Sequence, residues 1–263
     1  MNIIERYLSG NGISFKYAKG ASSMEGREFH PYHEIILFYG ESAYLFSETV
    51  STAIRPGTVI VIPKETYHQM NIIGSSDSYE RCVLHFSDIR ELSPLIRKIT
   101  MDLTITEAES GLFFLFDKLK KAAENPETDT INHALLNSVL TLVLSELESE
   151  TKNLTIAPSI NPLIARCTAF IAEHLDENLA ISRIARELNT SESLLSHVFR
   201  DEMNISIHQY IVKKRLVTAF EKISSGHPAT LAASECGFNE YSNFYRQYKK
   251  AFGFPPSSKD YRV

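Results

Sequence analysis

The chain has 263 residues, of which 43% are hydrophobic and 22% charged, and its formal net charge is −5. This composition excludes disordered, collagen-like and coiled-coil chains, and it supplies enough apolar residues for one large or two ordinary domains. The three cysteines, Cys82, Cys167 and Cys236, are odd in number and widely spaced, which indicates neither a disulfide framework nor a metal pair. No segment is predicted to span a membrane, and the charged pair Glu5–Arg6 interrupts any signal peptide, so we expect a cytoplasmic protein.

The first 86 residues read as short strands. The segments YHEIILFYG, SAYLFS, GTVIVIP and YERCVLHF are rich in Ile, Val, Tyr and Phe, and turn residues such as Gly40 and Pro63 separate them. The pattern predicts a small β-barrel, followed by two helices.

From about residue 107 the hydrophobic period becomes helical, with a first helix before NPETDT (125–130) and a second helix after it. The apolar stripe of the second helix either covers the barrel of its own chain or packs against the same stripe of a second subunit. We favour a homodimer through residues 131–148. The stripe consists of Leu135, Leu136, Val139, Leu140, Val143 and Leu147.

A polar, proline-containing segment at 151–161 is the predicted linker, and the charge changes sign across it. Residues 1–159 carry 14 Lys/Arg against 21 Asp/Glu, a net charge of −7, whereas residues 160–263 carry 13 against 11, a net charge of +2. The acidity of the whole chain therefore does not exclude a nucleic-acid-binding domain at its C-terminal end.

The C-terminal part contains an internal repeat. IARELNTSESLLSHVFRDEM (184–203) superposes on AASECGFNEYSNFYRQYKKAF (232–252), with one extra residue in the second turn. Each copy predicts a short helix, a tight turn and a longer helix that begins after a capping residue, Ser191 or Asn239. This is the helix-turn-helix pattern.

The second helix of such a unit can lie in the major groove of DNA, with its outer face toward the base edges. Arg246 matches the O6 and N7 acceptors of guanine, whereas Arg200 and Lys249 suit phosphates. The helix expected between the copies, at 206–226, is about 30 Å long, close to the ~34 Å turn of B-DNA, so one chain can reach two successive grooves. The outward-facing candidates are Ser193, Ser196, His197, Arg200, Tyr241, Ser242, Tyr245, Arg246 and Lys249.

Here the sequence resembles a known family. The stretch from LAISRIARELNTSESLLSHVFRDEM through VKKRLVTAFEKI, together with ASECGFNEYSNFYRQYKKAFGFPPSSKDYR, resembles the DNA-binding domain of AraC/XylS-type regulators. The resemblance implies a bacterial transcription regulator, more often an activator, that binds double-stranded promoter DNA. RNA polymerase is a further candidate partner. The family's base-contacting positions correspond to Ser193, Ser196, His197, Tyr241, Ser242, Tyr245 and Arg246. The chain departs from the family at Asn189, which replaces a glycine in the first turn, and at Ala232.

The N-terminal half resembles a sensory cupin-like domain. RPGTVIVIPKETYHQMN is similar to the second cupin motif, and FHPYHEIILFYG is similar to the start of the first. The resemblance implies a small-molecule effector. His33, Glu34 and His68 also offer a 2-His-1-carboxylate metal set, but the His-x-x-His spacing and Glu65 depart from the motif, so we predict no metal and no cofactor. The expected effector-binding residues are His33, Tyr39, Tyr44, His68 and His85.

The predicted fold is therefore multi-domain. An N-terminal cupin-like β-barrel (1–105) precedes a helical dimerisation segment (106–150), the linker (151–161) and an all-α domain with two helix-turn-helix motifs (162–263). The predicted function is effector-controlled transcription regulation, without catalytic residues. The alternative is a cupin-type metal enzyme tethered to DNA. Covalent chemistry on DNA through a cysteine is a poorer reading, because Cys167 and Cys236 fall on apolar helix faces.

Overall fold

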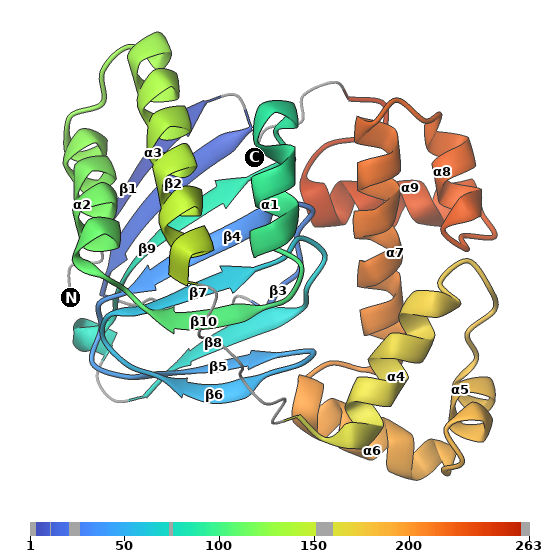
Figure 1. The fold of residues 1–263 in the computed structure, drawn as a ribbon. Coiled ribbons are helices and arrows are strands. Elements are labelled where there is room, and N and C mark those ends of the chain that lie inside the picture. The colour runs from blue at the N-terminus through green and yellow to red at the C-terminus, as the bar shows by residue number, and fades with distance from the viewer. Residues whose placement is uncertain (1–3, 11, 21–26, 74–75, 151–159, 259–263) are drawn as a thin grey trace.

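Figure 1 shows the computed structural model of the chain, which describes residues 4–10, 12–20, 27–73, 76–150 and 160–258. A sheet-rich domain formed by the N-terminal half lies beside a set of helices formed by the C-terminal half. The predicted order, with a sheet-rich domain before an all-helical one, is confirmed.

The N-terminal domain contains two antiparallel sheets that share a core. The six-stranded sheet has the order β1-β2-β9-β4-β7-β10, and the four-stranded sheet has the order β3-β8-β5-β6. Neither sheet closes on itself within the described residues, so the closed barrel is not confirmed. The strands are β1 (Ile4–Gly10), β2 (Ile13–Lys19), β3 (Arg27–Glu28), β4 (His33–Phe38), β5 (Ala43–Ser47), β6 (Ser51–Ile54), β7 (Thr58–Ile62), β8 (His68–Ile72), β9 (Glu80–Phe86) and β10 (Thr104–Glu107).

The central strands β4 and β7 are buried over their whole length, which explains why their sequences are continuous apolar runs. Because successive side chains of a strand point to opposite faces, each strand serves two cores. Ile35 and Leu37 lie in the core under the helices, whereas Ile36 and Phe38 lie in the core between the two sheets. This alternation also decides which polar side chains of the central strands can meet.

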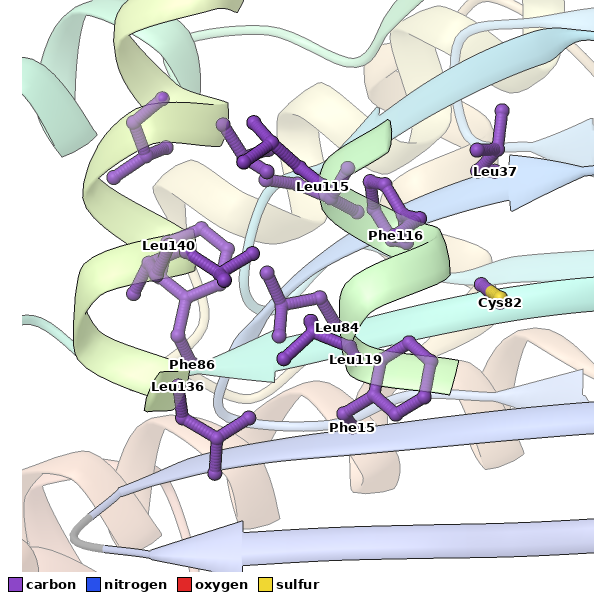
Figure 2. Packing of buried hydrophobic residues seen from close by; sticks show 14 of the residues in the cluster. Phe15, Leu37, Cys82, Leu84, Phe86, Leu115, Phe116, Leu119, Leu136 and Leu140 are labelled. Carbon is purple, nitrogen blue, oxygen red and sulfur yellow. The ribbon is translucent and has the colours of Figure 1, made fainter. Parts of the chain in front are cut away.

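Three helices, α1 (Ser93–Ile99), α2 (Ser110–Glu124) and α3 (Asp129–Glu150), cover the outer face of the six-stranded sheet. Figure 2 shows Leu136 and Leu140 of α3 and Leu119 of α2 packed with Leu84 and Phe86 of the sheet. Two short 3₁₀ helices, η1 (Ser76–Ser78) and η2 (Arg90–Leu92), complete the domain.

The apolar stripe of α3 is covered by its own chain. Leu136, Leu140 and Val143 have no exposed area, and Leu147 is only 1% exposed. The interpretation of this stripe as a zipper between subunits is therefore wrong, because the sheet, α1 and α2 already occupy it. The opposite face of α3 exposes Ile131 and Leu142. A homodimer through residues 131–148 stays a prediction and would have to use that face.

The structure shows no domain boundary at residue 105, where the sequence predicted one. Strand β10 crosses it, since Ile105 pairs with Ile60 of β7 in the six-stranded sheet. Helices α2 and α3 share one core with that sheet, so residues up to 150 pack as one unit. Most of the predicted linker (151–161) lies outside the described residues. The last residue of the predicted linker, Asn161, accepts a hydrogen bond from the Leu163 amide and caps the helix that follows.

The C-terminal domain consists of two helical groups joined by one long helix. Helices α4, α5 and α6 pack together, α8 and α9 pack together, and α7 contacts α6, α8 and α9. No described helix is long and apolar enough to cross a bilayer. The helices are α4 (Pro162–Glu173), α5 (Ile181–Glu187), α6 (Glu192–Met203), α7 (Ile207–Ser224), α8 (Ala229–Glu235) and α9 (Tyr241–Phe252).

Candidate functional sites

The first helix-turn-helix unit is α5, the turn at 188–191 and α6. Asn189 adopts a left-handed conformation, with φ 54°, and lets the chain reverse. Ser191 then caps α6 by accepting a hydrogen bond from the Leu194 amide at 3.2 Å. Leu195 and Phe199 are fully buried, so the opposite face of α6 is left for solvent or DNA.

The second unit, α8 to α9, repeats this turn. Gly237 has φ 79° at the position that superposes on Asn189, so the two turns reverse in the same way despite different residues. The N-cap of α9 is Glu240, which makes no side-chain capping bond, so the expectation of a cap at Asn239 is wrong. Phe244 and Tyr248 are fully buried and fix the face of α9 that points inward.

Arg215 of α7 links the segment after α4 to the turn of the second unit, and sequence reasoning did not single it out. Its Nε donates to the carbonyl of Leu175 at 2.9 Å, and one terminal nitrogen donates to the carbonyl of Glu177 at 2.6 Å. The same guanidinium lies against Gly237 in the second turn. One side chain therefore sets the position of the end of α4 relative to the turn before α9.

The predicted DNA-contacting side chains share two outward faces. Eight of the nine are exposed, and Ser196 is half-buried. His197 pairs with Asp201 one turn later on α6, at 3.2 Å, which adds an acidic group beside the predicted contacts. Two further exposed apolar side chains, Leu194 on α6 and Leu231 on α8, were not predicted. The exposed residues of the set are Ser193, His197, Arg200, Tyr241, Ser242, Tyr245, Arg246 and Lys249.

A histidine cluster surrounds Glu34 in the interior between the two sheets. One carboxylate oxygen, Oε2, lies 2.9 Å from His30 Nε2 and 3.0 Å from His68 Nε2. The other, Oε1, lies 3.5 Å from His85 Nε2. Burial would raise the pKa of the Glu34 carboxyl, but the neighbouring imidazoles of His30, His68 and His85 outweigh it and hold that pKa well below its usual range.

The five residues expected to line one effector pocket do not lie together. Only His68 and His85 meet, at Glu34. His33 follows the opposite face of β4 and pairs with Asp88 at 3.2 Å, because neighbouring residues of a strand point apart. Tyr39 packs on Phe113 under α2, and Tyr44 is exposed on β5, where it accepts a hydrogen bond from Ser51. The metal set His33–Glu34–His68 is wrong for the same reason, and His30 takes the place of His33.

The sheet domain contacts the helical domain through buried aromatic residues. Tyr67 has no exposed area, and its hydroxyl donates to the carbonyl of Met203, the last residue of α6, at 2.9 Å. Phe29 packs on Tyr67 and on Tyr210 of α7, with ring centroids 6.4 and 6.2 Å apart. The sheet domain thus satisfies one of the carbonyls left free at the end of α6.

Charged groups surround this aromatic contact. Lys214 Nζ of α7 donates to the Glu65 carbonyl at 2.7 Å, and Lys64 pairs with Glu221 of α7 at 2.6 Å. Burial, followed by the nearby Glu221 carboxylate, raises the pKa of Glu65 to about 8. Several cavities open along this boundary, among them one of about 650 Å³ beside Lys64 and Lys214, and one of about 400 Å³ between His30, Tyr32 and the aromatic residues of α7 and α9.

Comparison with known proteins gives consistent matches. Residues 184–260 match a family described as a helix-turn-helix domain. Over 242 residues the chain is 22% identical to the probable transcriptional regulator LumQ of Photobacterium leiognathi, covering 87% of this chain and 89% of LumQ. Over 124 residues it is 28% identical to the arabinose operon regulatory protein of Escherichia coli (strain K12), covering 46% of this chain and 42% of that protein. Among solved structures, ToxT from Vibrio cholerae O395 is 13% identical with a TM-score of 0.43, over 97% of this chain and 95% of that one.

The sequence matches and the two helix-turn-helix units agree with the resemblance stated above. The sequence relatives are regulators of transcription. The residues that match the family extend from the middle of α5 to beyond the end of α9. The chain therefore resembles AraC/XylS-type transcriptional regulators, and its residues 184–260 match a helix-turn-helix domain family.

Proposed function

We propose that this regulator binds promoter DNA sequence-specifically, with α6 and α9 as two recognition helices in successive major grooves. The observation that carries this proposal is the pair of matching units, each with a buried inner face and an exposed outer face on its second helix. Helix α7 has 18 residues, which corresponds to about 27 Å, so it spaces the two units by a little less than the ~34 Å turn of B-DNA.

Arg246 is the strongest candidate for base readout. It is exposed on α9, and its planar fork fits the two acceptors of guanine in the major groove. Arg200 and Lys249 are exposed toward the ends of their helices, and they suit phosphate contacts that set orientation rather than sequence. Ser193, His197 and Ser242 can each make a single hydrogen bond to a base, which discriminates between bases less strongly than a bidentate arginine contact does.

A binding assay tests this assignment. A DNA site is first selected from a random library with the wild-type chain, and the affinity of Arg246→Ala for that site and for single-base variants is then measured. We expect a loss of about 1–3 kcal/mol at the selected site and relaxed preference at one base pair. Arg97→Ala, an exposed arginine on α1 of the sheet domain, is the matched control and should bind as the wild type does. Unchanged affinity of Arg246→Ala for all sequences would contradict the assignment.

We further propose that an effector at the N-terminal domain controls this binding and that the protein acts as an activator on a homodimeric site. The contact between Tyr67 and the end of α6 supports effector control, since any change in the sheet domain near Tyr67 reaches a recognition helix directly. The cavities beside Lys64 and beside His30 have volumes suited to small ligands. Equal promoter affinity and equal transcription for the full chain and the isolated C-terminal domain, in all conditions, would contradict this control.

The alternative, a metal enzyme tethered to DNA, requires that a substrate reach the cluster around Glu34. Glu34 has no exposed area, and His30 and His68 are 6% and 3% exposed. The regulator is therefore the function that we propose.

A further inference from the structure

In the cluster around Glu34, hydrogen-bond acceptors face one another, and a bound cation resolves this mismatch. The Nδ1 atom of His30 lies 2.8 Å from the carbonyl oxygen of Tyr32, and the Nδ1 atom of His68 lies 3.0 Å from the carbonyl oxygen of Thr66. A carbonyl oxygen only accepts hydrogen bonds, so each Nδ1 carries the proton. In the neutral ring the Nε2 atom is then a bare acceptor.

Both of these Nε2 atoms face an acceptor. They lie 2.9 and 3.0 Å from the same oxygen of Glu34. Two neutral imidazole nitrogens and a carboxylate oxygen cannot bond one another unless a proton or a metal ion lies between them. Protonating both rings would place two imidazolium charges around one carboxylate in a site that is almost completely buried.

A second observation supports a bound cation at the same place. Glu34 Oε1 and His85 Nε2 are buried and make no hydrogen bond, although they lie 3.5 Å apart. Buried polar atoms are normally partnered, and their exceptions call for an unseen ligand or ion. The cluster therefore brings four side chains together around two buried atoms, Glu34 Oε1 and His85 Nε2, that make no hydrogen bond.

The fold brings these residues together from both sheets. Glu34 and His85 are directly paired residues of β4 and β9 on the inward face of the six-stranded sheet. His68 comes from β8 of the facing sheet, and His30 comes from the segment that leads into β4. The ligand atoms offered by His30, Glu34 and His68 all lie within 4.8 Å of one another. Bonds of about 2.0–2.2 Å require donor separations of about 3–4 Å, so small side-chain rotations suffice.

We propose that His30, Glu34 and His68, with His85 as a fourth ligand, bind one divalent transition-metal ion. The carbonyls that hold each Nδ1–H serve as the outer partners that metal-bound histidines usually have. Three imidazoles and one carboxylate suit zinc, iron, cobalt or nickel, whereas magnesium and calcium prefer oxygen ligands. The site replaces our expectation of no metal, and it does not depend on DNA binding.

Cobalt binding to the untagged full chain tests the proposal. After chelator treatment, titration with Co²⁺ should give visible d–d absorption that saturates at about one equivalent. Zn²⁺ should remove this absorption, and millimolar Mg²⁺ should not. His30→Ala, His68→Ala and Glu34→Gln should each weaken Co²⁺ binding by about 100-fold or more, beyond the 10–100-fold typical of outer partners.

His33→Ala is the matched control, because His33 is equally buried and next to Glu34 but points away from the cluster. It should bind Co²⁺ within about threefold of the wild type, and so should His227→Ala, which removes an exposed histidine. Circular dichroism shows whether each variant is folded. Less than half an equivalent of Co²⁺ on the wild-type chain would overturn the proposal whatever the variants do, and so would equal losses for His33→Ala and His30→Ala.

Discussion

The guanidinium of Arg215 occupies the space that a side chain at Gly237 would need. A Cβ atom built on Gly237 would lie 2.6–2.9 Å from three guanidinium atoms of Arg215. Arg215 cannot swing away without losing its bonds to the carbonyls of Leu175 and Glu177. The turn of the second helix-turn-helix unit and the end of α4 are therefore fixed by one shared contact.

Gly237→Ala should destabilise the C-terminal domain more than Gly226→Ala does. Both glycines have positive φ, 79° and 99°, so each alanine carries a backbone penalty of about 1–2 kcal/mol. Of these two positions, only at Gly237 would the Cβ atom clash with a neighbouring side chain, because a Cβ at Gly226 would meet nothing within 4 Å. We expect an additional loss of about 1.5–3 kcal/mol for Gly237→Ala, the range for a hydrogen bond to a charged group. Urea unfolding measures both variants, and equal losses would contradict the role of Arg215.

Tyr67→Phe should weaken the contact between the two domains. The variant keeps the buried ring but removes the hydroxyl that donates to the Met203 carbonyl, which leaves a buried acceptor unpaired at a cost of about 1–3 kcal/mol. Amide hydrogen exchange of the full chain should become faster at the end of α6 and stay unchanged in α9. Tyr241→Phe, at an exposed tyrosine, should change neither region. An unaltered exchange pattern in Tyr67→Phe would contradict the importance of this bond.

Glu65 should make the chain less stable as the pH rises from about 4.5 to about 8. The pKa of Glu65 is raised from 4.5 to about 8 in the folded chain, by burial and then by Glu221, while Lys214 and Lys64 oppose the shift. In that window the folded state holds a proton that the unfolded state has released, so the free energy of unfolding decreases with pH and levels off above about 8. Glu65→Gln should flatten this decrease in denaturant titrations at pH 5, 6, 7 and 8. Glu41→Gln, an exposed acid, is the control. The same slope for the wild type and Glu65→Gln would contradict the assignment to Glu65.

Metal binding should also stabilise the contact between the sheet domain and the helical domain. His30 and His68 are the direct neighbours of Phe29 and Tyr67, which make the aromatic contact with α6 and α7. One equivalent of Zn²⁺ should raise the thermal midpoint of the wild-type chain, because a ligand that binds only the folded state stabilises it. Glu34→Gln should show no such rise, and His33→Ala should keep it. A rise of equal size in Glu34→Gln would place the ion elsewhere.

The features that depend on local pattern could be predicted from the sequence. The repeat at 184–203 and 232–252 places both helix-turn-helix units, and helical period places Arg246 outward and Phe244 inward. Long-range contacts could not be predicted. The stripe containing Leu140 has the same pattern whether its own sheet or a second subunit covers it.

The histidine cluster shows the same limit at a finer scale. A shift of one residue in a strand changes the face, so His33 and Glu34 are adjacent in the sequence yet point apart. His30 meets Glu34 because the chain bends at Pro31 and Tyr32 before β4. Pro31 indicates a bend, but its direction cannot be predicted from the sequence. Similarly, nothing in the sequence around Arg215 marks its contact with a turn 22 residues away.

Base-by-base affinity scanning of a selected DNA site tests the central claim most directly. The wild-type chain should show two blocks of sensitive base pairs with centres about 10–10.5 base pairs apart, one for each recognition helix. Arg246→Ala should remove sensitivity in one block, and His197→Ala should reduce it in the other. A single block of sensitive base pairs, or loss in the same block for both variants, would contradict reading of DNA by two helix-turn-helix units.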